Sequence, residues 1–531
     1  MRRLVTVAMA CAALGIGISS GAYAESFKWA SQGDILTFDP HAQNESFNNA
    51  AASYVYDSLV RYGKDGKIEP ALAESWKTVP EGFVFKIRQG VKFHEGQTLI
   101  PEDVVFSIQR ALHPKSQFRT YTAGIIGVEK LPDGQVLIKT TSLTPVILNQ
   151  LAELRILNKE WAEKHNVLEP QDYVGKQESY AARHANGTGP FILKSREVDI
   201  KTVFEKNPNW WDEKNREGNV TEAVYTPIKS AATRTAALLS GQVDFVLDPG
   251  PQDLNRLKRD ANVKLVEGPE TRVVMISLDQ MRDVSPYVTV NGQKVEKNPF
   301  KDVRVRKALY EAIDVQTLKR TVMRGSSDPT GTVIAKAVNG WTPKAAERFP
   351  YDVADAKKLL AEAGYPDGFE FILDVPNNRW VNDEAIAKAL AAMWAKIGVK
   401  VQVNSMPRAK YFPKVLSFDS SAGMVGWGAT TRDGLFPIQS LTETFDAAKG
   451  NGLSNIGRIS DPKLDAIIEK IKVEPDATKR NALIEEALLL IKNQFYQLPL
   501  HGQMISWAMR KNVDAPFRPD NRLEIQKVIV K

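Results

Sequence analysis

The chain has 531 residues, of which 43% are hydrophobic and 25% charged. These proportions are typical of a globular protein, and because one hydrophobic core rarely grows beyond about 300 residues, we expect two or three domains. The 70 Lys and Arg exceed the 63 Asp and Glu, for a net charge of +7. The positive residues are scattered and form no basic stripe with interleaved aromatics, which argues against a nucleic-acid partner.

The first twenty-four residues have the layout of a secretory signal peptide. Arg2 and Arg3 precede an apolar run at residues 4–18. Residues 22–24, Ala-Tyr-Ala, then match the A-x-A pattern of a signal-peptidase cleavage site. The run is too short to span the roughly 30 Å of a bilayer core. We therefore expect export to the periplasm, with cleavage after Ala24.

The single cysteine, Cys11, lies inside this leader. The mature chain is therefore expected to have no disulfide, no thiol nucleophile and no thiolate metal site. Apolar sequence continues past Cys11, so we expect no lipid anchor there. No later stretch reaches about 18 consecutive apolar residues, which predicts a soluble mature chain.

Hydrophobic periodicity and turn residues predict strands and helices that alternate without a fixed repeat. In chain order we expect a strand and turn at 27–39, a helix at 48–59, a strand at 83–87, extended chain at 91–93, a helix at 101–112, a hairpin at 128–139, a strand at 191–194, a helix at 231–239, a strand at 243–247, helices at 303–323 and 353–363, a strand at 369–375, a helix at 383–397, a strand at 399–403, and helices at 462–471 and 477–492. This alternation indicates an α/β protein.

Sequence motifs of known enzyme classes are absent or have a simpler explanation. A Gly-x-Ser-x-Gly string at residues 17–21 falls in the leader, and Ser460-x-x-Lys463 is better explained as the start of a helix. There is no H-E-x-x-H, no phosphate-binding loop and no G-x-G-x-x-G. The six histidines are dispersed without metal-ligand spacing. We therefore expect no catalytic residues, no metal site, no cofactor and no enzymatic activity.

Three motifs lie close together near the N-terminus. Residues 70–76 read PALAESW, residues 90–96 read GVKFHEG and residues 101–107 read PEDVVFS. Further blocks follow along the chain: GTGPF at 187–191, KNPNWW at 206–211, GQVD at 241–244, PFKDVRVRKALYEAID at 299–314, AKKLLAEAGYPDGF at 356–369, AKIGV at 395–399 and LPL at 498–500.

Together these blocks closely resemble the peptide/nickel-type (family 5) solute-binding proteins of ABC importers over nearly the whole mature chain. The resemblance implies a two-lobed α/β periplasmic-binding-protein fold, cluster C type, with an extra small domain. It implies a discontinuous first lobe from residues 25–65, 189–284 and 494–531, the small domain at 66–188 and the second lobe at 285–493. Ligand would be enclosed by hinge closure. The implied partner is an inner-membrane ABC permease with cytoplasmic ATPase subunits, and we expect a monomer.

The resemblance also implies where a ligand would bind. In peptide-binding relatives an Asp three residues after a Gly-Trp pair binds the peptide ammonium, but here Gly426-Trp427 is followed by Thr430 at that place. Because a buried ammonium needs a carboxylate, either Asp433 takes this role or the ligand lacks a terminal ammonium. Arg379 is a candidate to bind a ligand carboxylate through two parallel hydrogen bonds. Further candidate wall residues are Asn44, Phe47, Tyr121, Asn377, Trp380, Tyr411, His501 and Gln503.

These departures from the family pattern leave the ligand class open. We favour a short or modified peptide, glutathione-like molecules included, because an extended ligand can pair with cleft backbone and water can fill side-chain pockets. The alternative is an opine, a sugar acid or another polar organic solute. A nickel chelate or haem is a further alternative.

Overall fold

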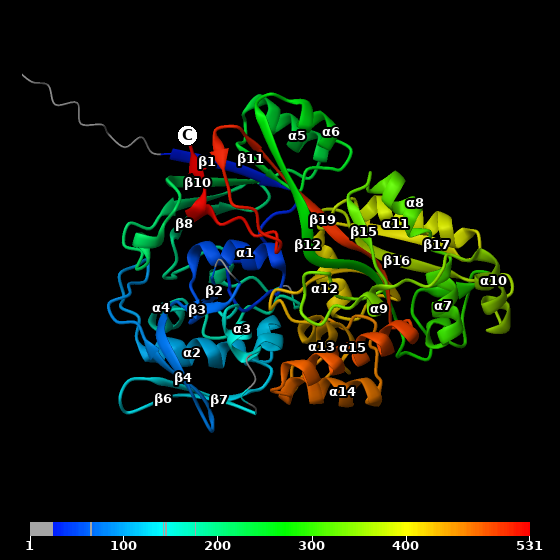
Figure 1. The fold of residues 1–531 in the computed structure, drawn as a ribbon, viewed down its shortest axis with the longest axis horizontal. Coiled ribbons are helices and arrows are strands. Elements are labelled where there is room, and N and C mark those ends of the chain that lie inside the picture. Colours follow the sequence, from blue (N-terminus) through cyan, green and yellow to red (C-terminus); the bar gives the residue numbers. More distant parts are fainter. Residues whose placement is uncertain (1–24, 64–65, 142, 144–145, 176) are drawn as a thin grey trace, which may run out of the picture.

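The computed structural model describes residues 25–63, 66–141, 143, 146–175 and 177–531 (Figure 1). The predicted signal peptide lies outside the described residues, so export and the cleavage site stay predictions. In the part of the chain that is described, no helix is long and apolar enough to cross a membrane.

A 13-stranded mixed sheet runs through the molecule. Its strands follow the order β14 (Gln293–Lys294), β13 (Val288–Val290), β16 (Glu370–Pro376), β18 (Ala422–Gly428), β12 (Val263–Leu278), β19 (Gln497–Arg510), β11 (Phe245–Leu247), β1 (Glu25–Ser31), β10 (Val220–Pro227), β9 (Lys201–Lys206) and β8 (Phe191–Glu197). In addition, β15 (Ser327–Pro329) pairs with β19, and β17 (Lys400–Met406) pairs with β16. The predicted α/β class is confirmed.

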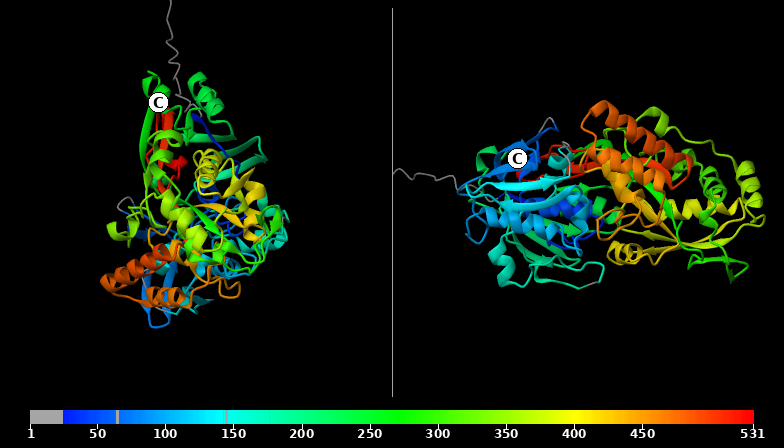
Figure 2. Two further views of the ribbon diagram at one scale, coloured as in Figure 1. Left: turned by 90° about the vertical axis from the view of Figure 1, so that its right-hand side faces the viewer. Right: turned by 90° about the horizontal axis from the view of Figure 1, so that it is seen from below.

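We call the part built on β1 and β8–β11 the first lobe and the part built on β13–β18 the second lobe; the two stand side by side in Figure 2. The long strands β12 and β19 are antiparallel to each other and belong to both lobes. At one end β19 pairs with β11 of the first lobe, and at the other end β12 pairs with β18 of the second. The lobes are thus joined through continuous sheet.

A separate four-stranded sheet forms the core of the small domain. Its order is β4 (Ala73–Val79), β5 (Gly82–Ile87), β7 (Val136–Thr140) and β6 (Ile125–Lys130). Helix α2 (Pro101–Ala111) packs on this sheet through Val104 and Ile108. Pro at its first position with two acids in the first turn is a favourable helix start, as the sequence predicts. The predicted domain boundaries at 65/66 and 188/189 stay predictions.

The remaining helices are distributed over the two lobes and the small domain (Figure 1). Their bounds are α1 (Ser46–Val55), α3 (Val146–Leu151), α4 (Lys159–Lys164), α5 (Ala231–Ser240), α6 (Leu254–Arg259), α7 (Val303–Glu311), α8 (Val315–Thr317), α9 (Pro343–Ala346), α10 (Val353–Glu362), α11 (Asp383–Ala395), α12 (Arg408–Leu416), α13 (Leu435–Thr442), α14 (Pro462–Val473) and α15 (Ala477–Asn493).

Two predicted helices differ from the structure. The single helix predicted at 303–323 is broken, because the Asp314 carboxylate accepts from the backbone N–H and the hydroxyl of Thr317 and starts a new helical segment there. The helix predicted at 48–59 ends at Val55, since Tyr56 is extended (φ −121°, ψ 143°). Both errors arise because apolar periodicity carries no information about side-chain caps or about the backbone conformation of a single residue.

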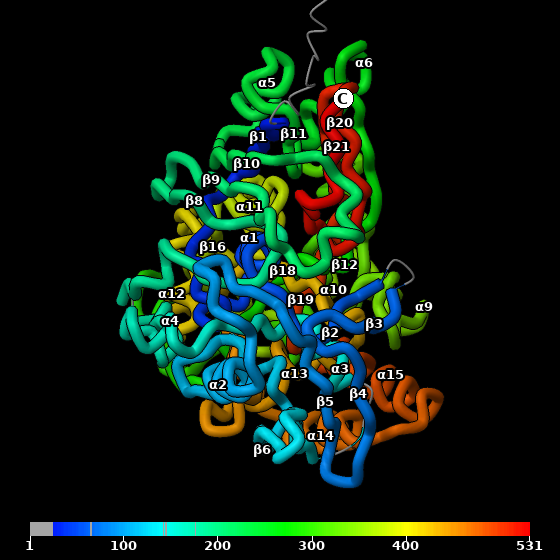
Figure 3. The backbone as a smooth tube through the Cα atoms, turned by 90° about the vertical axis from the view of Figure 1, so that its left-hand side faces the viewer, coloured from blue at the N-terminus to red at the C-terminus, as the bar shows by residue number. Residues whose placement is uncertain are grey.

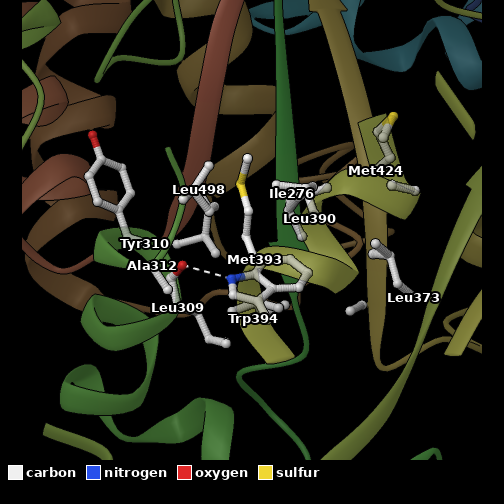
Figure 4. Packing of buried hydrophobic residues seen from close by; sticks show 14 of the residues in the cluster. Ile276, Leu309, Tyr310, Ala312, Leu373, Leu390, Met393, Trp394, Met424 and Leu498 are labelled. Atoms are coloured by element: carbon white, nitrogen blue, oxygen red, sulfur yellow. Dashed lines mark hydrogen bonds between the residues drawn. The ribbon is translucent and has the colours of Figure 1, made fainter. Parts of the chain in front are cut away.

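The largest hydrophobic core lies in the second lobe, and Trp394 of α11 is at its centre (Figure 4). The indole is fully buried, and its Nε1–H donates to the carbonyl oxygen of Leu309 at 2.8 Å. Its ring also packs against Phe371 of β16, with ring centres 5.7 Å apart. Trp394 therefore fixes the position of α11 on the sheet.

We expect Trp394→Ala to lower the free energy of unfolding by about 3–5 kcal/mol, because it leaves a large cavity in a close-packed core. Trp394→Phe keeps most of the packing but leaves the Leu309 carbonyl without its donor, so about 1–3 kcal/mol is expected. Urea denaturation of the mature chain measures both. A loss below about 1 kcal/mol for Trp394→Ala would contradict the assigned role.

Candidate functional site

A cavity of about 70 Å³ lies where the two lobes and the small domain meet. Of the predicted site residues, it is lined by Asn44, Tyr121, Arg379, Trp380, Tyr411, Gly426, Trp427 and Thr430. Residues from four distant parts of the sequence therefore meet here.

Glycine at position 426 is explained by the indole of Trp380, which occupies the space where a Cβ at 426 would lie. Behind this pair, the hydroxyl of Tyr411 donates to the backbone carbonyl oxygen of Met424 on the same strand, β18. An aromatic wall is thus packed directly onto β18. A substitution of Gly426 would displace the Trp380 ring from the cavity wall.

Four other predicted site residues do not line this cavity. Phe47 borders a smaller cavity of about 20 Å³, with the Arg408 guanidinium 5.2 Å from its ring centre. Asn377 borders a different cavity, which Asp248 and Asp383 also line. His501 is buried on β19, and burial lowers its pKa to about 4, so it is neutral at pH 7. Gln503 donates to Glu270 at 2.6 Å.

Asp433 is held in a buried ion pair and does not line the cavity. Its two carboxylate oxygens accept from the Arg480 guanidinium at 2.6 and 2.7 Å, and Asn339 donates to one of them at 3.0 Å. A carboxylate already neutralised by a guanidinium is a poor partner for a ligand ammonium. Of the two alternatives that the sequence leaves open, this pairing favours a ligand without a terminal ammonium.

A cluster of charged groups crosses the cleft at the N-terminus of α1. Glu45 caps this helix by accepting from the backbone N–H of Phe47 and Asn48. The same carboxylate lies 2.5 Å from Nε of Arg379 and 3.2 Å from Nη1 of Arg408, both on the second lobe. Although burial acts to raise the pKa of Glu45, the two guanidiniums lower it below its usual value. One buried carboxylate thus joins the lobes.

A third guanidinium enters from β12, at a break in its pairing with β19. The register between the two strands shifts between Pro269 and Val273, a bulge of the kind that redirects side chains. Arg272 donates to Glu270 at 2.9 Å, to the carbonyl oxygen of Gly426 at 2.7 Å and to the hydroxyl of Ser46 at 3.0 Å. Its guanidinium lines the cavity.

Positive charge exceeds negative charge around the cavity. The charged residues of the wall itself are Glu45, Arg272 and Arg379, which is two guanidiniums for one carboxylate. Burial lowers the pKa of Arg379 to about 10, so it stays charged at pH 7. Nε and Nη2 of Arg408 have no hydrogen-bond partner among the described residues. The site is therefore suited to an added negative charge.

Tyr121 of the small domain links both lobes at the opposite wall. Its hydroxyl donates to Oδ1 of Asn44 in the first lobe at 3.2 Å, and a hydrogen bond of 2.8 Å joins it to the hydroxyl of Thr430 in the second. Its ring stacks on Phe436 of α13, with centres 4.8 Å apart. Thr430 therefore contributes a neutral hydroxyl group at the position where an aspartate would have placed a negative charge.

The segment that carries Arg379 and Trp380 is held by Asp383, the first residue of α11. One oxygen of the Asp383 carboxylate accepts from the backbone N–H of both residues at 3.0 Å. Burial raises the pKa of Asp383 to about 6, against the opposing effect of these N–H groups. Because this pKa exceeds the ordinary value of about 3.9, the folded state binds the proton more tightly than the unfolded state.

Protonation of Asp383 is therefore expected to stabilise the fold. The stabilisation is full below about pH 4 and is lost as the pH rises through about 6. We expect the difference in unfolding free energy between wild type and Asp383→Asn to shift in favour of the wild type by about 2 kcal/mol when the pH falls from about 7 to 4. Asp248, whose pKa burial also raises to about 6, is present in both proteins and cancels in the comparison. A pH-independent difference would contradict the assignment.

Glu45, Arg272 and Arg408 were not among the residues predicted from the sequence. Glutamate is not a favoured N-cap, so the sequence before α1 gives no capping signal. Arg272 has a usable signal, since it and Glu270 directly precede the apolar run Val273–Ile276 of a buried strand. Charged side chains at the edge of such a run require partners, and here those partners form the site.

Comparisons with known proteins place the chain in a family. Residues 67–449 match the model of the bacterial extracellular solute-binding proteins, family 5 middle. The dipeptide-binding protein of Pseudomonas aeruginosa is 28% identical, with 97% of this chain and 96% of that protein covered. Heme-binding protein A of Haemophilus influenzae is 29% identical, with 89% and 86% covered.

Among solved structures, the PBP AgaA in complex with agropinic acid, from A. tumefacien R10, has a TM-score of 0.83 at 22% identity. That similarity covers 96% of this chain and 99% of AgaA, so the two share their fold over nearly their full lengths. Because the family model matches well over half of the sequence, the chain belongs to family 5 of the bacterial extracellular solute-binding proteins.

Proposed function

We propose that the protein is the periplasmic solute-binding component of an ABC importer. It captures a short or modified peptide between its lobes and delivers it to an inner-membrane permease with cytoplasmic ATPase subunits. The observation that carries this proposal is the cavity walled jointly by both lobes and the small domain. Closure around a solute assembles this cavity, and the work is differential affinity for the closed state rather than chemistry.

The charges of the site favour particular end groups on the ligand. The guanidiniums of Arg272 and Arg379 are suited to a carboxylate, and the one acid in the wall, Glu45, already pairs with two arginines. A ligand ammonium would be desolvated without a carboxylate to compensate it. The site therefore favours a peptide whose amino end is blocked or linked elsewhere.

The positive charge of Arg272 and Arg379 in the cavity wall also supports a second class of ligand. An opine, a sugar acid or another polar carboxylate also presents a negative charge without a peptide ammonium. The Tyr121–Thr430 hydrogen bond shows that this wall offers neutral hydroxyl groups, which suit a polar ligand with hydroxyl or amide groups.

A thermal-shift panel on the mature chain tests the proposal. It includes free dipeptides, the same dipeptides N-acetylated, glutathione, opines, sugar acids, nickel–histidine and haem. A ligand that binds only the folded state stabilises it by about 2.7 kcal/mol at a hundredfold excess over Kd. We expect N-acetylated dipeptides or a non-peptide carboxylate to stabilise the protein more than free dipeptides do.

Thr430→Asp is the matched variant, because it restores an acid at the expected position beside the Tyr121 hydroxyl. It should gain binding of free dipeptides and lose affinity for N-acetylated ones. If the wild type already binds free dipeptides as tightly as acetylated ones, the inferred end-group preference is wrong. If no solute in the panel stabilises the wild type, the proposed ligand classes are wrong.

A further inference from the structure

One end of the cleft cavity is apolar. It is lined by Phe412, Val415 and Leu416 of α12, by Met424 of β18 and by Ile456 from the loop after α13. In Figure 3, which looks from the side of the small domain, α12 lies farther back than α1 and α2 (Figure 1). We call these five side chains the apolar end of the cavity.

The apolar end lies at the start of β18, next to Gly423. A Cβ on residue 423 would lie 2.8 Å from Cδ1 of Ile456 and 3.7 Å from Cγ1 of Val415. The charged side chains lie toward the other end of the same strand, where a Cβ on Gly428 would be 3.2 Å from Nη2 of Arg272. Positions 423 and 428 are separated by roughly 16 Å along a strand.

Trp380 lines the cavity between the charged side chains and the apolar end. Its ring centre is 6.4 Å from that of Tyr411 and 6.5 Å from that of Phe412, both on α12. Cζ of the neighbouring Arg379 lies 5.6 Å from the same indole. The lining therefore changes from guanidinium groups, through aromatic rings, to aliphatic side chains.

The apolar end has surface that a ligand can bury. Phe412, Leu416 and Ile456 are only half-buried, although each packs against the core of the second lobe. An apolar group that covers this surface is stabilised by the hydrophobic effect. A hydroxyl group at the same place would be desolvated without compensation, because these side chains offer no hydrogen-bond donor and at most a weak acceptor.

We propose that the ligand of the cleft is an amphiphilic carboxylate, with its carboxylate at Arg272 and Arg379 and an apolar group at the apolar end. An N-acylated amino acid or short peptide has this layout, because its amide blocks the nitrogen and its acyl group is apolar. The lining also contains Gln117 and Ser454, whose polar side chains can bond to such an amide. The inference rests on the proposed function and chooses between its two ligand classes, since a sugar acid has no apolar group for this end.

Calorimetric titration of the mature protein with a series of N-acylglycines tests the proposal. The acyl group is acetyl, butyryl or hexanoyl, so the carboxylate and the amide stay the same while the apolar chain grows. We expect Kd to tighten about two- to fourfold for each added methylene, so hexanoylglycine should bind at least about tenfold more tightly than acetylglycine. A hexanoyl chain that ends in a hydroxyl group should lose most of this gain.

A pair of variants tests where the acyl chain lies. Leu416→Asn places a polar side chain of similar size in the apolar end, and should reduce the affinity ratio of hexanoylglycine to acetylglycine to less than about threefold. Leu359→Asn is the matched control, because Leu359 of α10 is a half-buried leucine that packs against the same core but does not line the cavity. It should leave that ratio within about twofold of the wild-type value.

The outcomes separate this inference from the proposed function. Affinity that does not depend on chain length in the wild type would overturn the inference, whether or not the variants fold. Equal ratios in Leu416→Asn and Leu359→Asn would also overturn it, because the chain would then lie elsewhere. If no acylglycine binds but a sugar acid or an opine does, the inference is wrong and the transport function is retained. If no carboxylate binds, both are wrong.

Discussion

Replacing Arg379 with glutamine is expected to weaken binding of a carboxylated ligand about a hundredfold while changing the affinity for its amide by less than about threefold. The reason is that truncating a buried guanidinium that contacts a ligand carboxylate costs several kcal/mol of binding free energy. Calorimetric titration with the acid and the amide of a ligand identified in the panel measures the difference directly. Equal losses for both forms would remove Arg379 from the ligand contact.

A double-variant test separates two roles that Arg379 could have. It lies 2.5 Å from Glu45, so its loss also leaves that carboxylate less neutralised and repels a ligand carboxylate indirectly. Glu45→Gln keeps an oxygen that caps α1 but removes the charge. If Arg379 contacts the ligand, adding Glu45→Gln to Arg379→Gln leaves binding of the acid weak. If Arg379 only neutralises Glu45, the second substitution restores binding.

Asp433→Ala is expected to lower the free energy of unfolding by about 3–5 kcal/mol and to leave ligand affinity within about twofold of the wild type. The substitution removes the partner of Arg480, whose side chain is 8% exposed, and so leaves a buried charge uncompensated. Urea unfolding gives the stability and calorimetry the affinity. A matched double variant, Asp433→Ala with Arg480→Met, should recover much of the lost stability because it removes the stranded charge.

The opposite result for Asp433 would be equally informative. A large fall in ligand affinity with little change in stability would mean that Asp433 leaves Arg480 when the ligand is present. The first alternative, in which Asp433 binds a ligand ammonium, would then hold in the bound protein.

Where helices have strong apolar periodicity and clear ends, the sequence predicts them well. The helix predicted at 383–397 is found at Asp383–Ala395, because its apolar stripe is regular and Gly398 follows it in a left-handed conformation. The break at Asp314 was missed, since a side-chain cap inside an apolar run leaves the periodicity unchanged. Local signals thus predict local structure and fail where one side chain redirects the backbone.

The site was predictable only in part, for a physical reason. The residues of the Gly426-Trp427 motif and Thr430 do line one cavity, and whether a ligand binds there stays a prediction. The pairing of Glu45 with Arg379 and Arg408 joins residues more than three hundred positions apart, and no local pattern reports it. His501 and Gln503 lie on a strand whose register shifts nearby, and a shift of one residue exchanges the two faces of a strand.

The shared strands β12 and β19 make the two lobes inseparable as building blocks. A fragment limited to the predicted second lobe, residues 285–493, would contain β18 but not the β12 strand that pairs with it along seven residues. The fragment would expose that edge of β18, and exposed sheet edges recruit other chains. We therefore expect a second-lobe fragment to fold poorly on its own, and engineering of this protein should treat the whole sheet as the smallest module.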